Sequence, residues 1–210
     1  ICKNEDIKEK VIKLHCDIYD KFSEECISSC WNIESVRFKN MFIYGNDTEN
    51  YIDFVHGVNN ICSKNMTGKS SIVNILNFAL FDTIGVTKED KTSIIHCGKK
   101  NGYIKLNISC NGIKYMIEKI TNSMNRSSRD IISTIFKTKL YKNNNGVMND
   151  ISETTTTSTC KKIKQMLGDS EIFISHNVIS TKYNHSLLNL TPLSRYKHFE
   201  SVFKVEIYNK

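Results

Sequence analysis

A glycine, a lysine and a serine in consecutive positions form the segment with the clearest chemical meaning in this sequence. Gly68, Lys69 and Ser70 match the end of the phosphate-binding loop pattern G-x-x-x-x-G-K-[ST], and Ser63 stands at its first glycine. In such a loop the backbone N–H groups at a helix N-terminus point at a β-phosphate. The lysine ammonium bridges β- and γ-oxygens, and the hydroxyl binds Mg²⁺. The chemistry indicated is nucleoside triphosphate binding.

The segments around this loop have the order that the pattern requires. Residues 58–62 form an apolar run that predicts a strand, and residues 69–81 carry apolar side chains at helical spacing. Strand, loop and helix would follow one another directly, which favours a phosphate loop over a loop that only caps a helix. Ser63 and Met66 depart from the pattern, because related loops often carry glycine there and glycine adopts the required torsions cheaply. The sequence is therefore also compatible with a distorted or weakened site.

Periodicity and turn signals predict the other elements. Apolar residues at helical spacing predict a helix over roughly residues 5–26, and the main domain begins near residue 34. Alternation predicts strands, and Asn111-Gly112 is the strongest hairpin signal in the chain. The predicted strands are 36–44, 51–55, 103–110, 113–119, 135–141 and one around Val147. Further helices are predicted between Thr154 and Gly168 and from Pro192, which follows the N-cap residue Thr191.

Length and composition fit one globular domain with a short appendage. The 210 residues are 40% hydrophobic and 24% charged, with no apolar run near 18 residues and no signal peptide, so we expect no membrane association. The net charge of +7 permits a polyanionic partner without requiring one, and the scattered lysines favour a solvated surface. Eight cysteines without a C-x-x-C pair favour a reducing, intracellular location. Because the chain opens with Ile1, we expect it to be a piece of a longer protein.

Several motifs in series resemble the amino-terminal half of the ABC-type ATPase heads found in double-strand-break-repair and chromosome-maintenance proteins. The nearest members are the SbcC type and the corresponding phage recombination-nuclease ATPase subunits. The resemblance covers residues 35–205, and Lys119 falls near an arginine of the family's hairpin. The segments that carry it are 36–44, 51–54, 57–61, 65–72, 98–119, 166–173, 187–188 and 195–203.

The resemblance implies a fold and a domain division. The fold is α/β, a P-loop NTPase whose amino-terminal head lobe carries an antiparallel β subdomain beside the P-loop strand and helix. Residues 1–34 would be a helical appendage or the tail of an upstream segment, and residues 35–205 would be the lobe. Residues 206–210 would begin the exit toward a coiled coil.

The resemblance also implies roles for individual residues, with ATP and Mg²⁺ as cofactors. Lys69 would bind the β- and γ-phosphates and Ser70 the metal. Thr181 stands where the family has a glutamine that holds the metal and the attacking water, and a threonine would reach the metal only through water. The remaining implied nucleotide contacts are Ser63, Lys64, Asn65, Met66, Thr67, Gly68 and Ser71 of the loop, and Lys39, Asn40 and Phe42 near the base and α-phosphate.

Two motifs of a complete head do not occur in these 210 residues. One is an apolar strand ending in Asp-Glu, whose Glu is the general base, and the other is an S-G-G signature helix. In the resembling family both lie beyond the coiled coil. We therefore expect one lobe of a split head: an ATPase in the intact protein, but slow or inactive as this chain alone.

The resemblance implies that two heads, a homodimer, sandwich ATP, clamp duplex DNA and gate a partner nuclease. That nuclease would be an SbcD-like subunit or a fused domain. Two alternatives stay open. One is another P-loop NTPase or a small kinase, although a kinase would have parallel βαβ units where this chain has an antiparallel hairpin. The other is a non-hydrolysing relative that binds DNA or a partner, which Ser63, Met66 and Thr181 favour.

Overall fold

The computed structural model describes residues 5–22, 30–45, 47–83, 94–126, 131–144, 146–168, 170, 173 and 191–203. The chain divides into two compact units, residues 29–171 and residues 1–28 with 172–210. Thr181, the segment 187–188 and the predicted exit at 206–210 lie outside the described residues. No described helix combines the length and apolarity needed to cross a membrane.

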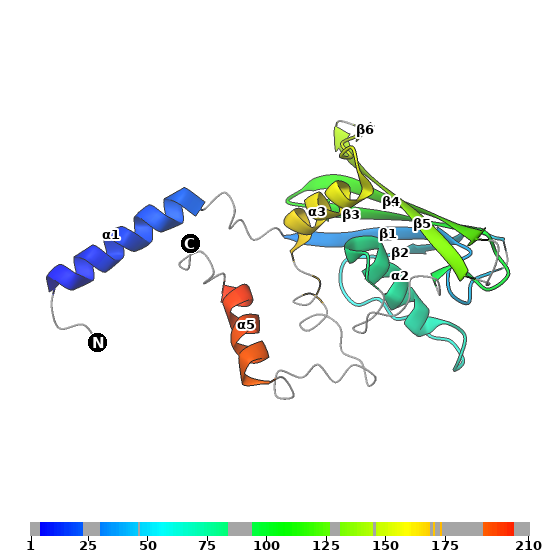
Figure 1. Cartoon of the computed structure of the whole chain (residues 1–210), viewed down its shortest axis with the longest axis horizontal. Coiled ribbons are helices and arrows are strands. Elements are labelled where there is room, and N and C mark those ends of the chain that lie inside the picture. The colour runs from blue at the N-terminus through cyan, green and yellow to red at the C-terminus, as the bar shows by residue number, and fades with distance from the viewer. Residues whose placement is uncertain are drawn as a thin grey trace. The chain divides into compact units, whose positions relative to one another are not determined.

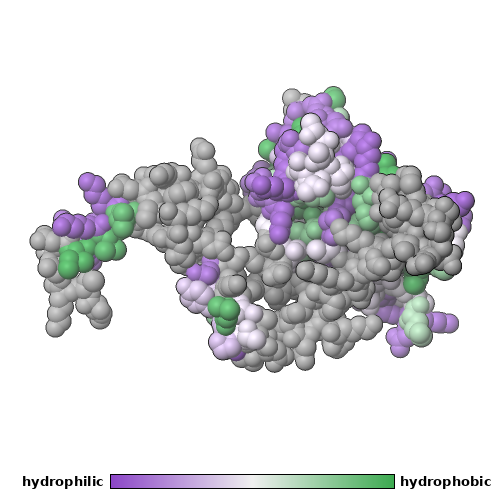
Figure 2. Space-filling model, in the orientation of Figure 1, coloured by the Kyte–Doolittle hydropathy of each residue, from purple (hydrophilic) through white to green (hydrophobic). Residues whose placement is uncertain are grey.

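Two helices of the smaller unit agree with their sequence signals. Helix α1 (Glu5–Phe22) is amphipathic, and Figure 2 shows its hydrophobic and hydrophilic residues gathered on different sides. Ile7, Val11 and Leu14 are about half exposed on it. Helix α5 (Pro192–Phe203) begins at the predicted cap, where the Thr191 hydroxyl accepts a hydrogen bond from the Ser194 N–H at 3.3 Å.

The larger unit is built on one antiparallel six-stranded sheet of order β2-β1-β3-β4-β5-β6 (Figure 1). Alternation along β3 buries Ile104, Leu106 and Ile108 on one face and leaves Tyr103 and Lys105 partly exposed on the other. The strands are β1 (Trp31–Lys39), β2 (Asn50–Asp53), β3 (Asn101–Cys110), β4 (Ile113–Arg126), β5 (Ile131–Asn144) and β6 (Val147–Asp150).

The hairpin predicted at Asn111-Gly112 is confirmed, the predicted strands at 135–141 and around Val147 pair as β5 and β6, and one predicted strand is displaced. Asn111 and Gly112 have φ values of 50° and 77°, as a type I′ turn requires between β3 and β4. At the β5–β6 turn the Gly146 N–H donates to the Asn143 side chain at 2.8 Å. Strand β1 ends at Lys39 and does not continue to residue 44, because Asn40 and Phe42 have φ values of 54° and 48° that turn the chain out of the sheet.

Helices α2 (Lys69–Phe81) and α3 (Thr156–Leu167) cover the buried face of the sheet (Figure 1). From α2, Ile75 and Phe78 are fully buried, and the Phe78 ring meets Phe136 of β5 edge-on at 5.2 Å. From α3, Ile163 and Leu167 join this core. On the opposite face the strands carry paired charges, such as Lys105 with Glu118 and Lys139 with Asp150.

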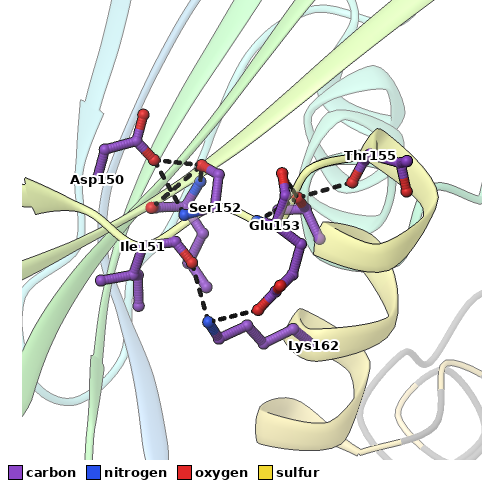
Figure 3. A network of polar contacts seen from close by, with 8 residues as sticks. Asp150, Ile151, Ser152, Glu153, Thr155 and Lys162 are labelled. Atoms are coloured by element: carbon purple, nitrogen blue, oxygen red, sulfur yellow. Dashed lines mark hydrogen bonds and ion pairs between the residues drawn. The ribbon is translucent and has the colours of Figure 1, made fainter.

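A polar network fixes the start of α3 against the end of the sheet (Figure 3). The Lys162 ammonium donates to the Ile151 carbonyl at 2.9 Å and to the Glu153 carboxylate at 2.8 Å. Thr155 caps the helix by accepting from the Ser158 N–H at 3.1 Å. At the other end the Trp31 indole donates to the Leu167 carbonyl at 3.1 Å. The Thr156 hydroxyl also donates to the Phe136 carbonyl of β5 at 3.5 Å, so both ends of α3 are tied to the sheet, and its predicted stop at Gly168 is confirmed.

The predicted strand at residues 58–62 is wrong, although the fold class is confirmed. These residues form no ladder, and Val58 is 96% exposed. The Asn59 side chain accepts from the Val55 N–H at 3.0 Å and donates to the Val55 carbonyl at 2.9 Å. This local bonding folds the chain back between residues 55 and 59, so a loop forms where the apolar run predicted a strand. The phosphate-loop pattern therefore follows a loop, not a strand.

Candidate nucleotide-binding site

The segment 63–68 closes on itself and leads directly into α2. The Thr67 hydroxyl donates to the Lys64 carbonyl at 2.8 Å and is hydrogen-bonded to the Ser63 hydroxyl. Gly68 has φ 98° and begins the helix, whose second residue, Ser70, is exposed. Because the first N–H groups of a helix lack intrahelical acceptors, this end of α2 offers donors and a positive dipole end to an anion.

Lys69 folds back over the segment that precedes it. Its ammonium donates to the Ser63 carbonyl at 2.6 Å and to the Lys64 carbonyl at 2.7 Å. The positive charge is thereby held beside the loop, close to the N-terminal end of the helix. Backbone donors, an ammonium and a hydroxyl thus lie within one short segment, which fits the phosphates of a nucleotide with its metal ion.

The two departures from the loop pattern have different consequences. Met66 has φ 64° and is 99% exposed, so a methionine adopts the left-handed conformation that glycine adopts more cheaply. Ser63, by contrast, does not have a positive φ. The torsional cost, about 1 kcal/mol for a non-glycine residue, therefore falls on Met66.

A turn after β1 supports the loop from the sheet side. The Tyr44 hydroxyl donates to the Gly68 carbonyl at 3.2 Å. Burial raises the pKa of Tyr44, so this donor stays protonated at physiological pH. A side chain on Gly68 would meet the Ile43 methyl group at 2.5 Å. Sequence reasoning missed Ile43 and Tyr44, because only the folded chain shows which residues touch Gly68.

Of the predicted contacts, Lys39 and Asn40 precede this turn and Phe42 lies within it. A second segment, residues 94–96, holds Asn40 and Phe42. The Phe42 N–H donates to the Ile94 carbonyl at 2.7 Å, and the His96 N–H donates to the Asn40 carbonyl at 3.0 Å. Lys39 and Phe42 are partly exposed, whereas Asn40 is 2% exposed. The residues that the structure places against Gly68 of the 63–68 loop are thus Ile43 and Tyr44, which follow the predicted contacts in the sequence.

The Asn40 side chain belongs to a small polar cluster with Asp47 and Lys99. The Asn40 amide donates to the Asp47 carboxylate at 3.0 Å, and the Lys99 ammonium pairs with the same carboxylate. Two hydrogen bonds lower the pKa of Asp47: the one from Lys99 has the larger effect, and the one from Asn40 the next largest. The buried Asn40 side chain therefore anchors the turn. Across the described residues, no group of three or more His, Cys, Asp or Glu side chains is placed to hold a metal ion.

Comparison with known proteins decides the family. A family model described as AAA domain (AAA_23) matches residues 35–210. The chain belongs to this family. It is 30% identical over 148 residues to the DNA double-strand break repair Rad50 ATPase of Sulfolobus acidocaldarius, covering 70% of this chain and 15% of that protein. With these findings the resemblance is confirmed: the chain is an amino-terminal head segment of the SMC/Rad50-like ABC-type ATPases, and the small-kinase alternative is not supported.

Other similar proteins extend the comparison. The uncharacterized protein R555 of Acanthamoeba polyphaga mimivirus is 23% identical over 217 residues, covering 95% of this chain and 16% of that protein. The chain thus spans about a sixth of the length of these curated relatives. Two structures of the recombination mediator protein RecF, with ATP or an ATP analogue, are 14% identical, with TM-scores of 0.41 and 0.43. The two matches cover 62% and 72% of this chain, and 31% and 36% of the respective RecF chains.

Replacement of Gly68 tests how tightly the loop is packed. We expect Gly68→Ala to destabilise the protein by about 3 kcal/mol, because left-handed torsion and the contact with Ile43 both oppose a methyl group. Gly112→Ala is the matched control, since Gly112 also has positive φ but nothing within 4 Å, and we expect about 1 kcal/mol. Urea unfolding measures both. Equal losses would show that the Ile43 contact is not restrictive.

Proposed function

We propose that this chain is the ATP-binding lobe of a DNA repair or recombination ATPase. The observation that carries the proposal is the placement of the Lys69 ammonium over the 63–68 loop at the N-terminal end of α2. The family supports the same assignment, and so does the similarity to the Sulfolobus protein, which is named for double-strand break repair.

The roles of the loop residues follow from their chemistry. With a nucleotide bound, Lys69 would exchange the neutral carbonyl oxygens of Ser63 and Lys64 for negatively charged phosphate oxygens, which are stronger acceptors. Ser70 would supply its hydroxyl to Mg²⁺, which would neutralise phosphate charge. The N–H groups of Asn65, Thr67 and Gly68 would face the phosphates, and the Ser71 N–H, which donates to the Gly68 carbonyl at 2.9 Å, would have to exchange that bond to join them. Because these contacts depend on phosphate charge, we expect ATP to bind more tightly than AMP.

ATP hydrolysis needs motifs that do not occur in these 210 residues. No apolar strand ending in Asp-Glu and no S-G-G segment occurs in the 210 residues. By the resemblance, Thr181 would stand where the family has a glutamine. We therefore propose that the general base and the signature helix come from another segment or another chain. The phosphate loop then contributes binding and charge stabilisation, which alone do not complete phosphoryl transfer.

The wider assembly is part of the proposal. Two heads would engage over ATP, the engaged pair would clamp duplex DNA through its phosphates, and a partner nuclease would be gated by that engagement. On the open face of the sheet several basic residues, including Arg37, Lys105 and Lys139, lie within 4 Å of carboxylates. Their charge is already partly neutralised, so we expect the DNA contacts to come from other basic residues.

Lys69→Ala tests nucleotide binding directly. We expect ATP affinity to fall about 10- to 100-fold, because hydrogen bonds to charged groups contribute about 1.5–3 kcal/mol each. Isothermal titration calorimetry with Mg²⁺ and ATP on the 210-residue chain gives the measurement. Lys114→Ala is the control, since Lys114 pairs with Glu34 and is 60% exposed. Equally weak binding by wild type and Lys69→Ala would remove the nucleotide assignment.

The division of the catalytic site predicts a binding protein without turnover. We expect the 210-residue chain to bind ATP while its phosphate release stays at the buffer rate, because the general base is missing. A coupled phosphate assay on protein already shown to bind ATP is the measurement. Turnover near one per second, lost in Lys69→Ala, would mean that this chain holds a complete catalytic site.

Duplex DNA binding is tested with the intact polypeptide that contains this lobe. We expect ATP-dependent affinity that falls with salt at a log–log slope of about −3 or steeper, because each neutralised phosphate contributes about −0.9. Fluorescence anisotropy with duplexes of unrelated sequence measures the slope. Lys69→Ala is expected to abolish the ATP-dependent part. A flat salt response, or affinity that depends on base sequence, would contradict backbone clamping.

A further inference from the structure

Lys119 stands out among the described residues as the charged side chain that the core encloses. It lies on β4 and is 1% exposed. Its ammonium donates to the Phe78 carbonyl at 2.7 Å and to the Asp82 carboxylate at 3.1 Å. It also lies over the Phe78 ring, 4.6 Å from the centroid. A buried ammonium is costly unless it is paired, and here the pairing groups belong to the C-terminal end of α2.

The C-terminal end of α2 is a place where a cation is favourable. The last carbonyls of a helix carry its negative dipole end and lack intrahelical donors. Asp82, the C-cap residue, has φ 60°, and its N–H donates to the Phe78 carbonyl at 3.0 Å. Lys119 donates to that same carbonyl from a strand 41 residues away in sequence. The helix end is therefore bound to the sheet by directional contacts as well as apolar packing.

The other end of α2 has a contact of the same kind. There the Tyr44 hydroxyl donates to the Gly68 carbonyl. Tyr44 follows β1 and Lys119 lies on β4, the two strands that flank β3 in the sheet. The helix between them has 13 residues, about 20 Å at 1.5 Å per residue. One polar contact at each end thus fixes where α2 lies along its own axis.

We infer that Lys119 is a positioning residue for the phosphate loop. By holding the C-terminal end of α2, it sets the position of the N-terminal end, where Lys69 and Ser70 lie. Its connection to the loop runs through the helix, since Lys119 contacts Phe78 and Asp82. This inference rests on the proposed function for its effect on ATP, and its effect on the loop can be measured without ATP.

The test compares variants of the 210-residue chain. Lys119→Met removes the charge and keeps the length, and Lys119→Arg restores a cation. Lys105→Met is the matched control, because Lys105 also lies on a strand and pairs with a carboxylate, Glu118, on the opposite face. The first readout is amide hydrogen exchange of residues 63–72 without nucleotide. The second is ATP affinity, alone and combined with Lys69→Ala.

Lys119→Met is expected to speed exchange at residues 63–72 and to weaken ATP binding, each about tenfold, a size typical of coupling through a packed element. We expect Lys119→Arg to recover most of both effects and Lys105→Met to change neither. In the Lys69→Ala background the loss on adding Lys119→Met should shrink to about twofold, since both residues act through one loop. Fully additive losses would overturn the inference.

Three other outcomes also decide whether Lys119 positions the phosphate loop. If Lys119→Met lowers only the unfolding midpoint and leaves loop exchange and ATP affinity unchanged, Lys119 is purely structural and the inference is overturned. If Lys119→Met does not fold, Asp82→Asn replaces it, because that variant keeps Lys119 and its bond to Phe78. Faster loop exchange in Asp82→Asn then supports the inference, and unchanged exchange overturns it. If the wild-type chain binds no ATP, the proposed function fails, while loop exchange still decides the role of Lys119.

Discussion

The seating of helix α2 on the buried face of the sheet is the contact on which the rest of the structure depends. Ile75, Phe78 and Ala79 are completely buried there, opposite a sheet face that buries Leu106 and Ile117. Removal of these side chains from water supplies the main driving force for packing, about 25 cal/mol per Å² of apolar surface. The phosphate loop has no strand before it, so its position is set by the helix that follows it.

Apolar packing and polar contacts have separate tasks in this arrangement. Packing is nearly non-directional, so it holds α2 against the sheet but determines its axial position weakly. Hydrogen bonds have narrow distance and angle ranges, so Tyr44 and Lys119 determine that position more sharply. α3 shows the same division, with Ile163 and Leu167 buried and its ends bound to the sheet through Thr156 and Trp31. The sheet thus carries two helices, each located by polar contacts at both ends.

Turns and helix caps, which depend on neighbouring residues, were predicted well from the sequence. Contacts between residues far apart in the sequence were not. Asn111-Gly112 and Thr191-Pro192 act through their immediate neighbours, so this turn and this cap were found where expected. Residues 58–62 have a strand-like composition, but no sequence window shows that Asn59 bonds to Val55 instead. The phosphate loop was found because its pattern is contiguous. Its supports were missed because Tyr44 and Lys119 lie 24 and 41 residues from the groups that they bind.

The contact between Gly68 and Ile43 bears on how relatives of this chain should be compared. A side chain at position 68 would collide with Ile43 whether or not a nucleotide is ever bound. The φ of 98° and the contact with Ile43 together therefore favour glycine here, even in a descendant that has lost its ligand. Lys69 is held differently, since its ammonium bonds to the loop's own carbonyls, those of Ser63 and Lys64. In an alignment of this family, the lysine is accordingly a better marker of retained activity than the glycine before it.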